Sequence, residues 1–164
     1  MGMLDYINSK IRRGPIDIDH EVATLNFLNK KIVFTNGCFD LLHQGHIEYL
    51  AKASELGDVL VIGLNTDDSI KRIKGSDRPI NDEIARAHVL ASLVFVDEVF
   101  FFDEDTPYEL IKRVNPDVLV KGADYKEEDI VGYDIVKAKG GEIITIDLVE
   151  GHSTSNLIDK IKQI

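Results

Sequence analysis

The stretch TNGCFDLLHQGH, Thr35 to His46, decides the fold of this chain. The apolar run before it, from Lys31 to Phe34, predicts a short buried strand. After it, apolar positions between residues 47 and 54 recur at helical spacing, which predicts a helix beginning near Gln44. A turn from a strand into a helix directs free backbone N–H groups and the positive end of a helix dipole at the space above the sheet. The stretch therefore predicts a site for a phosphate.

His43 and His46 are three residues apart, so both side chains project from the same side of the first helical turn. Three interpretations are open: polar residues that open a helix, metal ligands together with Cys38 or Asp40, or two N–H donors for a phosphate. Zinc needs a closed set of ligands, and the chain has no second cysteine. We therefore predict no metal held by protein side chains.

Two glycines favour the phosphate interpretation, because a side chain at Gly37 or Gly45 would obstruct the close approach of a triphosphate. A second stretch, GHSTS from Gly151 to Ser155, places three hydroxyls at the start of the last predicted helix. It suits a β- or γ-phosphate, although a plain N-cap would need only one of the three hydroxyls.

The composition limits the classes of partner. The 164 residues suit a single domain. The 29 acidic residues outnumber the 19 basic ones and give a net charge of −10, which argues against nucleic acid or an anionic membrane as partner. A small anionic ligand is still allowed, because a local group of N–H donors binds phosphate even in an acidic protein. The single cysteine fits a reducing cytoplasm, and no segment approaches the ~18 apolar residues of a membrane span.

Five apolar runs alternate with predicted helices, and they are Lys31–Phe34, Asp58–Leu64, Val99–Phe102, Val118–Val120 and Glu142–Ile146. This order predicts an α/β fold, a single Rossmann-like domain over residues 31–164 with a five-stranded parallel sheet and helices on both faces. Residues 1–30 are predicted to be a helical extension. In such sheets the ligand lies beyond the carboxyl ends of the strands, at the point where the strand order reverses.

The remaining polar residues leave alternatives. Lys71, Lys74, Arg78 and Arg86 are cations in an acidic chain, and they are either solvated surface residues or a group facing the phosphates. Asp124 follows the fourth predicted strand, where it either binds a sugar hydroxyl or pairs with Lys121.

The segment GCFDLLHQGH matches the GxFDxxHxGH signature of the cytidylyltransferase-like nucleotidyltransferases. Together with VIGLNTDDSIKRIKGSDRPIN, PDVLVKGADY and GGEIITIDLVEGHSTSNLI, it resembles the D-glycero-β-D-manno-heptose 1-phosphate adenylyltransferases of lipopolysaccharide assembly, from about Lys31 to the end of the chain. In many of those relatives the domain follows a sugar kinase. Only 30 residues precede the resembling region here, so the kinase is expected to be a separate chain, and the resemblance also implies a homodimer.

The resemblance implies roles for individual residues. His43 and His46 are expected to be the catalytic pair, with Lys74 and Arg86 as catalytic cations facing the phosphates. The implied nucleotide-binding residues are Asn36, Gly37, Cys38, Phe39, Gly45, Lys71, Lys121, Asp124, Gly151, Ser153, Thr154 and Ser155. ATP would bring Mg²⁺ bound through its phosphates. A sugar phosphate is already a nucleophile near pH 7, because its second pKa is about 6.

Two departures weaken an assignment as a glycerol-3-phosphate cytidylyltransferase, which carries an arginine where this chain has Leu148 and an isoleucine where it has His152. Lys121 or His152 would then supply the missing positive charge. The expected reaction is ATP plus heptose 1-phosphate giving ADP-heptose and pyrophosphate. The alternatives are glycerol 3-phosphate with CTP, FMN with ATP, and a nucleotide-binding module without turnover.

Overall fold

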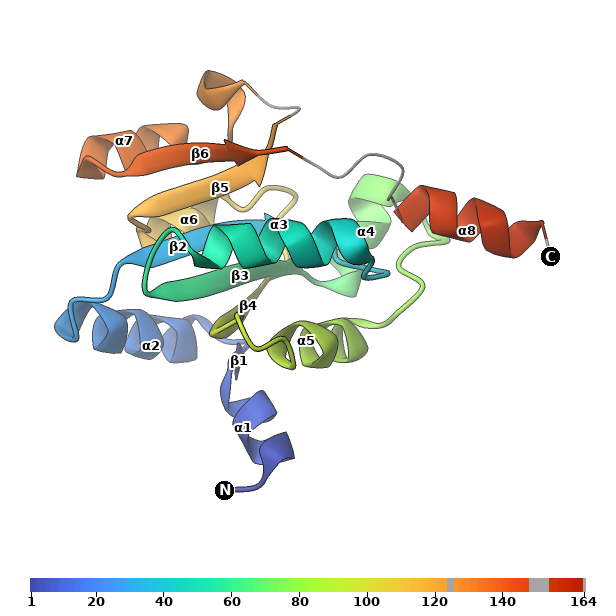
Figure 1. Ribbon diagram of the computed structural model, residues 1–164, viewed down its shortest axis with the longest axis horizontal. Helices are drawn as coiled ribbons and strands as arrows, with labels where there is room; N and C mark the ends of the chain where they lie inside the picture. The colour runs from blue at the N-terminus through green and yellow to red at the C-terminus, as the bar shows by residue number, and fades with distance from the viewer. Residues whose placement is uncertain (124–125, 148–153, 164) are drawn as a thin grey trace.

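A computed structural model of the protein describes residues 1–123, 126–147 and 154–163 (Figure 1). Its elements along the chain are α1 (Met3–Ser9), β1 (Ile11–Arg12), α2 (Pro15–Phe27), β2 (Ile32–Gly37), α3 (Gln44–Ser54), β3 (Val59–Asn65), α4 (Asp67–Lys74), α5 (Glu83–Ala91), β4 (Glu98–Phe102), α6 (Tyr108–Val114), β5 (Val118–Gly122), the 3₁₀ turn η1 (Glu127–Asp129), α7 (Tyr133–Lys139), β6 (Glu142–Ile146) and α8 (Thr154–Lys162). Asp124, Leu148, Gly151, His152 and Ser153 lie outside the described residues.

All neighbouring strands of the single sheet are parallel, and their order is β1-β4-β3-β2-β5-β6. The five predicted strands are present as β2 to β6, so the parallel α/β fold is confirmed. The predicted number of five is wrong, because Ile11 and Arg12 add a sixth strand beside Val99 and Phe100 of β4. The strand order reverses at β2, which has β3 on one side and β5 on the other.

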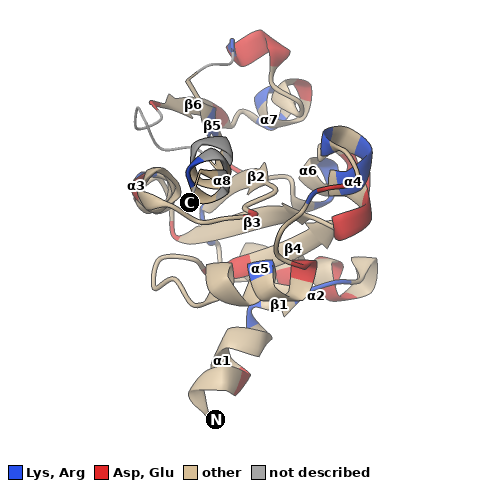
Figure 2. Ribbon diagram, turned by 90° about the vertical axis from the view of Figure 1, so that its right-hand side faces the viewer, with Lys and Arg blue, Asp and Glu red and all other residues tan. Residues whose placement is uncertain are grey.

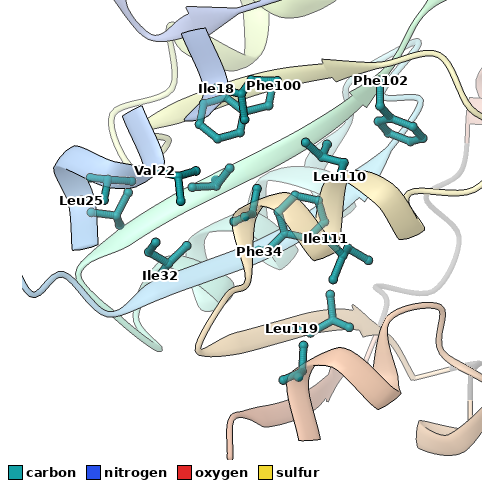
Figure 3. Packing of buried hydrophobic residues seen from close by; sticks show 14 of the residues in the cluster. Ile18, Val22, Leu25, Ile32, Phe34, Phe100, Phe102, Leu110, Ile111 and Leu119 are labelled. Carbon is teal, nitrogen blue, oxygen red and sulfur yellow. The ribbon is translucent and has the colours of Figure 1, made fainter. Parts of the chain in front are cut away.

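Successive strand residues point to opposite sides of the sheet, so the apolar strands present two hydrophobic faces. Helices cover both of these faces. In β2, Ile32 and Phe34 belong to one hydrophobic cluster, whereas Val33 belongs to the other. The first cluster is closed by α2, α6 and α7, and Figure 3 shows Ile18, Val22 and Leu25 of α2 over the strands. The second cluster is closed by α3 and α5. In the described part of the chain, no helix is long and apolar enough to cross a membrane.

Side-chain caps fix the two helices that flank the segment 75–81. The Thr66 hydroxyl accepts a hydrogen bond from the backbone N–H of Ser69 at 3.2 Å and starts α4. The Asp82 carboxylate accepts one from the N–H of Ala85 at 2.8 Å and starts α5. Each cap satisfies a backbone donor that a helix start leaves open, and the Asp82 cap lies directly after the segment.

The β1 edge carries a buried carboxyl group. The side chain of Glu98 in β4 is 12% exposed and lies 3.6 Å from the Arg12 guanidinium. The pKa of Glu98 is raised to about 8, and burial is the main cause. The charge of Arg12 opposes this rise, whereas the carboxylates of Glu21 and Asp97 contribute to it. Glu98 is therefore protonated in the folded protein at pH 7, whereas it is ionised in the unfolded chain.

We expect the substitution Glu98→Gln to stabilise the protein relative to the wild type as the pH rises from about 4.5 to about 8. Over this interval the unfolded wild type has released a proton that the folded state retains, so its free energy of unfolding falls with pH. Glutamine does not titrate and imitates the protonated acid. Chemical denaturation at pH 5, 6, 7 and 8 measures the difference, with the exposed Glu109→Gln as control. Parallel pH profiles for Glu98→Gln and the wild type would show that Glu98 is ionised in the fold.

Candidate active site

The signature stretch forms the predicted turn between β2 and α3. His43 is the N-cap of α3, and its backbone carbonyl accepts hydrogen bonds from the N–H groups of His46 at 3.0 Å and Ile47 at 3.2 Å. The predicted helix start at Gln44 is confirmed. Gly45 is buried in the first turn of this helix. The backbone N–H groups at the start of α3 lie at the carboxyl end of β2, where the strand order reverses.

The two histidines of the signature are stacked on each other. Their ring centroids lie 3.8 Å apart with an angle of 24° between the planes. Phe39 contacts His46 from another side, at 5.3 Å between ring centroids. Phe39 has a positive φ of 44°, and this conformation brings its ring over Gly37, where an added Cβ would lie 3.0 Å from Cε2. Gly37 therefore gives room to the ring that packs on His46.

His46 is neutral at pH 7. Its pKa is lowered to about 4, mainly by burial and in part by the electrostatic effect of His43 and Lys74. Its Nδ1 atom is buried and has no hydrogen-bond partner among the described residues. A neutral imidazole donates one hydrogen bond and accepts another. His46 is therefore suited to donating an N–H to an anionic oxygen, and at pH 7 it carries no proton to give as a general acid.

A pocket of about 360 Å³ opens at the carboxyl ends of β2 and β5, between the start of α3 and the start of α8. The Lys121 ammonium donates a hydrogen bond to the Asn36 side-chain oxygen across these two strand ends. The Thr154 hydroxyl donates one to the Leu41 carbonyl at 3.3 Å and ties α8 to the signature turn. Figure 2 looks onto this end of the sheet and shows α8 in front of it, beside α3.

Most of the predicted site residues that the structure describes gather here. The residues that line the pocket are Asn36, Gly37, Cys38, Phe39, Asp40, His46, Tyr49, Lys74, Arg78, Lys121, Gly122 and Thr154. His43 stacks on His46, and Ser155 lies in the first turn of α8. Asp124, Gly151 and Ser153 were also predicted, and they lie outside the described residues.

Two predicted cations lie elsewhere. Lys71 is an exposed residue of α4 whose ammonium pairs with Asp68 at 3.2 Å, and it does not line the pocket. Arg86 of α5 is 1% exposed and does not line the pocket either. The expectation that Arg86 faces the phosphates differs from this geometry, because its guanidinium is already occupied inside the protein.

The buried Arg86 guanidinium joins four chain segments. It donates to the backbone carbonyls of Cys38 at 2.7 Å and Asn65 at 2.9 Å, and to Asn81 at 3.1 Å. It also pairs with the Asp67 carboxylate at 2.7 Å. Arg86 thus ties the signature turn to the end of β3, to the start of α4 and to the segment before α5. Through its bond to the Cys38 carbonyl it holds a lining residue of the pocket in place.

Sequence reasoning missed the contacts of two polar residues of the pocket, Tyr49 and Asp40. The Tyr49 hydroxyl shares a 2.8 Å hydrogen bond with the hydroxyl of Thr35, which is buried in β2. Asp40 pairs with Arg78 at 2.8 Å. Asp40 was considered only as a metal ligand, whereas Arg78 was left open as either a solvated cation or one of a group facing the phosphates. For Asp40 a signal was available in the sequence, because this residue occupies the aspartate position of the GxFDxxHxGH signature.

We expect Cys38→Ser to retain kcat within a few-fold of the wild type. The Cys38 thiol makes only a long contact of 3.9 Å with the Asn65 side-chain oxygen, whereas its backbone carbonyl binds Arg86. Serine keeps the backbone and a small donor at the same position. Within the described residues, no cluster of three or more His, Cys, Asp or Glu side chains is placed to hold a metal ion. A folded but inactive Cys38→Ser variant in a pyrophosphate-release assay would instead indicate chemistry at the thiol.

Several curated proteins resemble most of this chain. It is 52% identical over 154 residues to the bifunctional protein HldE of Citrifermentans bemidjiense, covering 94% of this chain and 31% of that protein. It is 62% identical over 133 residues to the bifunctional protein HldE of Campylobacter concisus, covering 81% of this chain and 27% of that protein. The chain thus spans about 30% of the length of these relatives. These matches lend no support to the predicted homodimer. They also lend no support to a separate kinase, because the relatives are named bifunctional.

Solved structures and a family model agree with this picture. A lipopolysaccharide core biosynthesis protein from Thermoplasma volcanium superposes with a TM-score of 0.63 at 30% identity, over 74% of this chain and 99% of that one. A pantoate-β-alanine ligase from Francisella tularensis shares the fold at 17% identity, with a TM-score of 0.61 over 94% of this chain and 78% of that one. The Cytidylyltransferase-like family model matches residues 34–157. On its signature, its fold and this match, the chain belongs to the cytidylyltransferase-like family.

Proposed function

We propose that this chain transfers AMP from ATP to D-glycero-β-D-manno-heptose 1-phosphate, giving ADP-heptose and pyrophosphate for lipopolysaccharide core synthesis. The observation that carries the proposal is the pocket at the reversal point of the sheet. It combines the neutral imidazole of His46, the ammonium groups of Lys74 and Lys121, and two helix starts. This set of donors and cations suits two polyanionic substrates and the charge that moves onto pyrophosphate.

The acceptor phosphate supplies its own nucleophilic oxygen, because its second pKa is about 6. The protein therefore has no need of a general base, and its task is to hold the two phosphates in line. His46 donates an N–H to the phosphoryl group that is attacked, and His43 holds the His46 ring by stacking and takes part in the same contact. Lys74 and the start of α8 at Thr154 stabilise the leaving pyrophosphate.

The Mg²⁺ that accompanies ATP is held by phosphate oxygens in this proposal. Among the described residues that line the pocket, Asp40 is the only carboxylate, and its two oxygens already accept hydrogen bonds from Arg78, Ile80 and Asn81. Each of the other polar side chains that line the pocket carries a hydrogen-bond donor, which suits the phosphates. When bound, the ion offsets part of the phosphate charge.

The heptose acceptor is supported by the likeness to the HldE proteins, at 52% and 62% identity, and by the solved structure described as a lipopolysaccharide core biosynthesis protein. The experiment is to mix the protein with Mg²⁺, ATP and heptose 1-phosphate and to measure pyrophosphate and ADP-heptose. CTP with glycerol 3-phosphate and ATP with FMN are the comparison pairs. Turnover with one of these pairs alone would reassign the acceptor, and no pyrophosphate with any pair would leave a nucleotide-binding module.

A further inference from the structure

Arg78 lines the same pocket, and the resemblance assigned it no role, although the sequence left open that it faces the phosphates together with Lys71, Lys74 and Arg86. It lies in the segment between α4 and α5, and it shares the pocket wall with Lys74 and His46. Its side chain is 19% exposed, which is low for an arginine in a loop. Its Nε donates a hydrogen bond to the Asp40 Oδ2 atom at 2.8 Å. One edge of the guanidinium is thus fixed by a residue of the signature turn.

Asp40 is built to hold this segment. Its carboxylate is 3% exposed and accepts hydrogen bonds from the backbone N–H groups of Ile80 at 2.8 Å and Asn81 at 2.9 Å. Its own carbonyl accepts a bond from the Asn81 side-chain amide at 2.9 Å. Burial alone would raise the pKa of Asp40, but the N–H groups of Asn81 and Ile80 and the charge of Arg78 outweigh it and lower the pKa. Asp40 stays ionised and is not available to take a proton.

The far side of the Arg78 guanidinium has no hydrogen-bond partner among the described residues. Its two terminal nitrogens, Nη1 and Nη2, make no hydrogen bond to any residue within 1–123, 126–147 or 154–163. An arginine held at Nε by a carboxylate keeps its plane fixed, and its terminal nitrogens then form a fork that matches two oxygens of one phosphate. The neighbouring lysine and imidazole in the same pocket wall provide further donors to the same anion.

We propose that Arg78 binds a phosphate group of one of the two substrates through its terminal nitrogens, and that Asp40 is a positioning residue that fixes the plane of the Arg78 guanidinium. This inference rests on the proposed function, because it requires that phosphates enter the pocket. It gives the segment 75–81 the task of closing one side of the phosphate site. It also gives the phosphate contact to Arg78 in place of Arg86, the arginine to which the resemblance assigned that role.

The test measures binding without turnover. Isothermal titration of Mg²⁺-ATP, inorganic pyrophosphate and heptose 1-phosphate is carried out with the wild type, Arg78→Gln and Arg78→Lys. We expect Arg78→Gln to weaken one ligand by 10- to 100-fold, which is the scale of a lost bidentate charged contact. Arg78→Lys should recover only a part, because an ammonium does not provide the fork. The matched control is Arg72→Gln on α4, whose guanidinium pairs with Asp105 outside the pocket.

Each outcome has one meaning. Weaker ATP and pyrophosphate binding assigns Arg78 to the nucleotide, and weaker heptose 1-phosphate binding assigns it to the acceptor. Unchanged affinities for all three ligands, or a wild type that binds none of them, would overturn the inference. A wild type that binds ATP but makes no ADP-heptose would refute the proposed function and leave the Arg78 comparison intact.

The role of Asp40 is tested by Asp40→Asn alone and together with Arg78→Gln. If Asp40 acts through Arg78, Asp40→Asn weakens the same ligand and leaves the other affinities unchanged, and the double variant binds that ligand no more weakly than Arg78→Gln. A merely structural role would lower the melting temperature without this selective loss. Effects on affinity that add in the double variant would show that Asp40 does not work through Arg78.

Discussion

His46→Ala should lower kcat by about 10²–10³-fold, and His43→Ala should have an effect of similar size. This is the scale of losing one donor that stabilises charge in a transition state. Since burial and the charges of His43 and Lys74 lower the pKa of His46 to about 4, its imidazole is neutral from pH 6 to 8. The loss in His46→Ala should therefore be the same at every pH in that interval. Initial rates of pyrophosphate release at saturating substrates provide the measurement.

The control for this prediction is His20→Ala, which removes an exposed histidine of α2. It should leave kcat unchanged. If His46→Ala retained near-normal kcat, the imidazole would have no part in the chemistry. If its loss disappeared at pH 8 but was large at pH 6, His46 would act as a charged acid, contrary to the burial of its ring.

Arg86→Met should destabilise the protein by about 3–5 kcal/mol, the usual cost of removing one member of a buried ion pair. The substitution leaves the buried Asn65 carbonyl and the partly buried Cys38 carbonyl without their donor, and it removes the partner of the Asp67 carboxylate, which is 25% exposed. A domain of this size is stable by roughly 5–15 kcal/mol in total, so the loss is a large part of the whole. Urea denaturation followed by circular dichroism measures it.

The matched control is Arg113→Met on α6, whose guanidinium pairs with Asp19 at the surface. An exposed pair contributes about 0–1 kcal/mol, so the control should remain close to the wild type. A wild-type free energy of unfolding in Arg86→Met, combined with lost activity, would restore the earlier expectation that this arginine reaches the substrate.

The sheet was predictable because its strands are buried on both faces. Runs such as Asp58–Leu64 have no other reasonable interpretation in a chain of this composition, and Thr66 and Asp82 mark helix starts by their own side-chain chemistry. The β1 strand was not predictable in this way. It has two residues, too few for an alternating pattern, and its stability comes from distant partners in β4 and from Lys10, whose ammonium donates to the Val96 carbonyl at 2.7 Å.

The positions of the site residues were predictable where a motif fixes the backbone. They were harder to predict for the cations that other helices and strands contribute to the pocket. His46 and the glycine turn follow from the signature. Arg86 is an example, because the resemblance implied that it faces the phosphates, whereas its guanidinium is bound to protein groups. Its position in the helix indicated burial, because Arg86 lies on the same helix face as Leu90, which is fully buried. Which of two neighbouring arginines meets the substrate depends on side-chain partners that no periodicity reveals.

The hydrophobic cluster shared by α2 and β2 has a practical consequence for anyone who shortens this chain. Ile18, Val22 and Leu25 pack on the same face as Ile32 and Phe34, so the predicted boundary at residue 30 falls between two parts of one core. An expression fragment trimmed to begin at Lys31 would expose those strand residues to water and invite aggregation. The smallest unit that folds is therefore larger than the stretch that carries the chemistry.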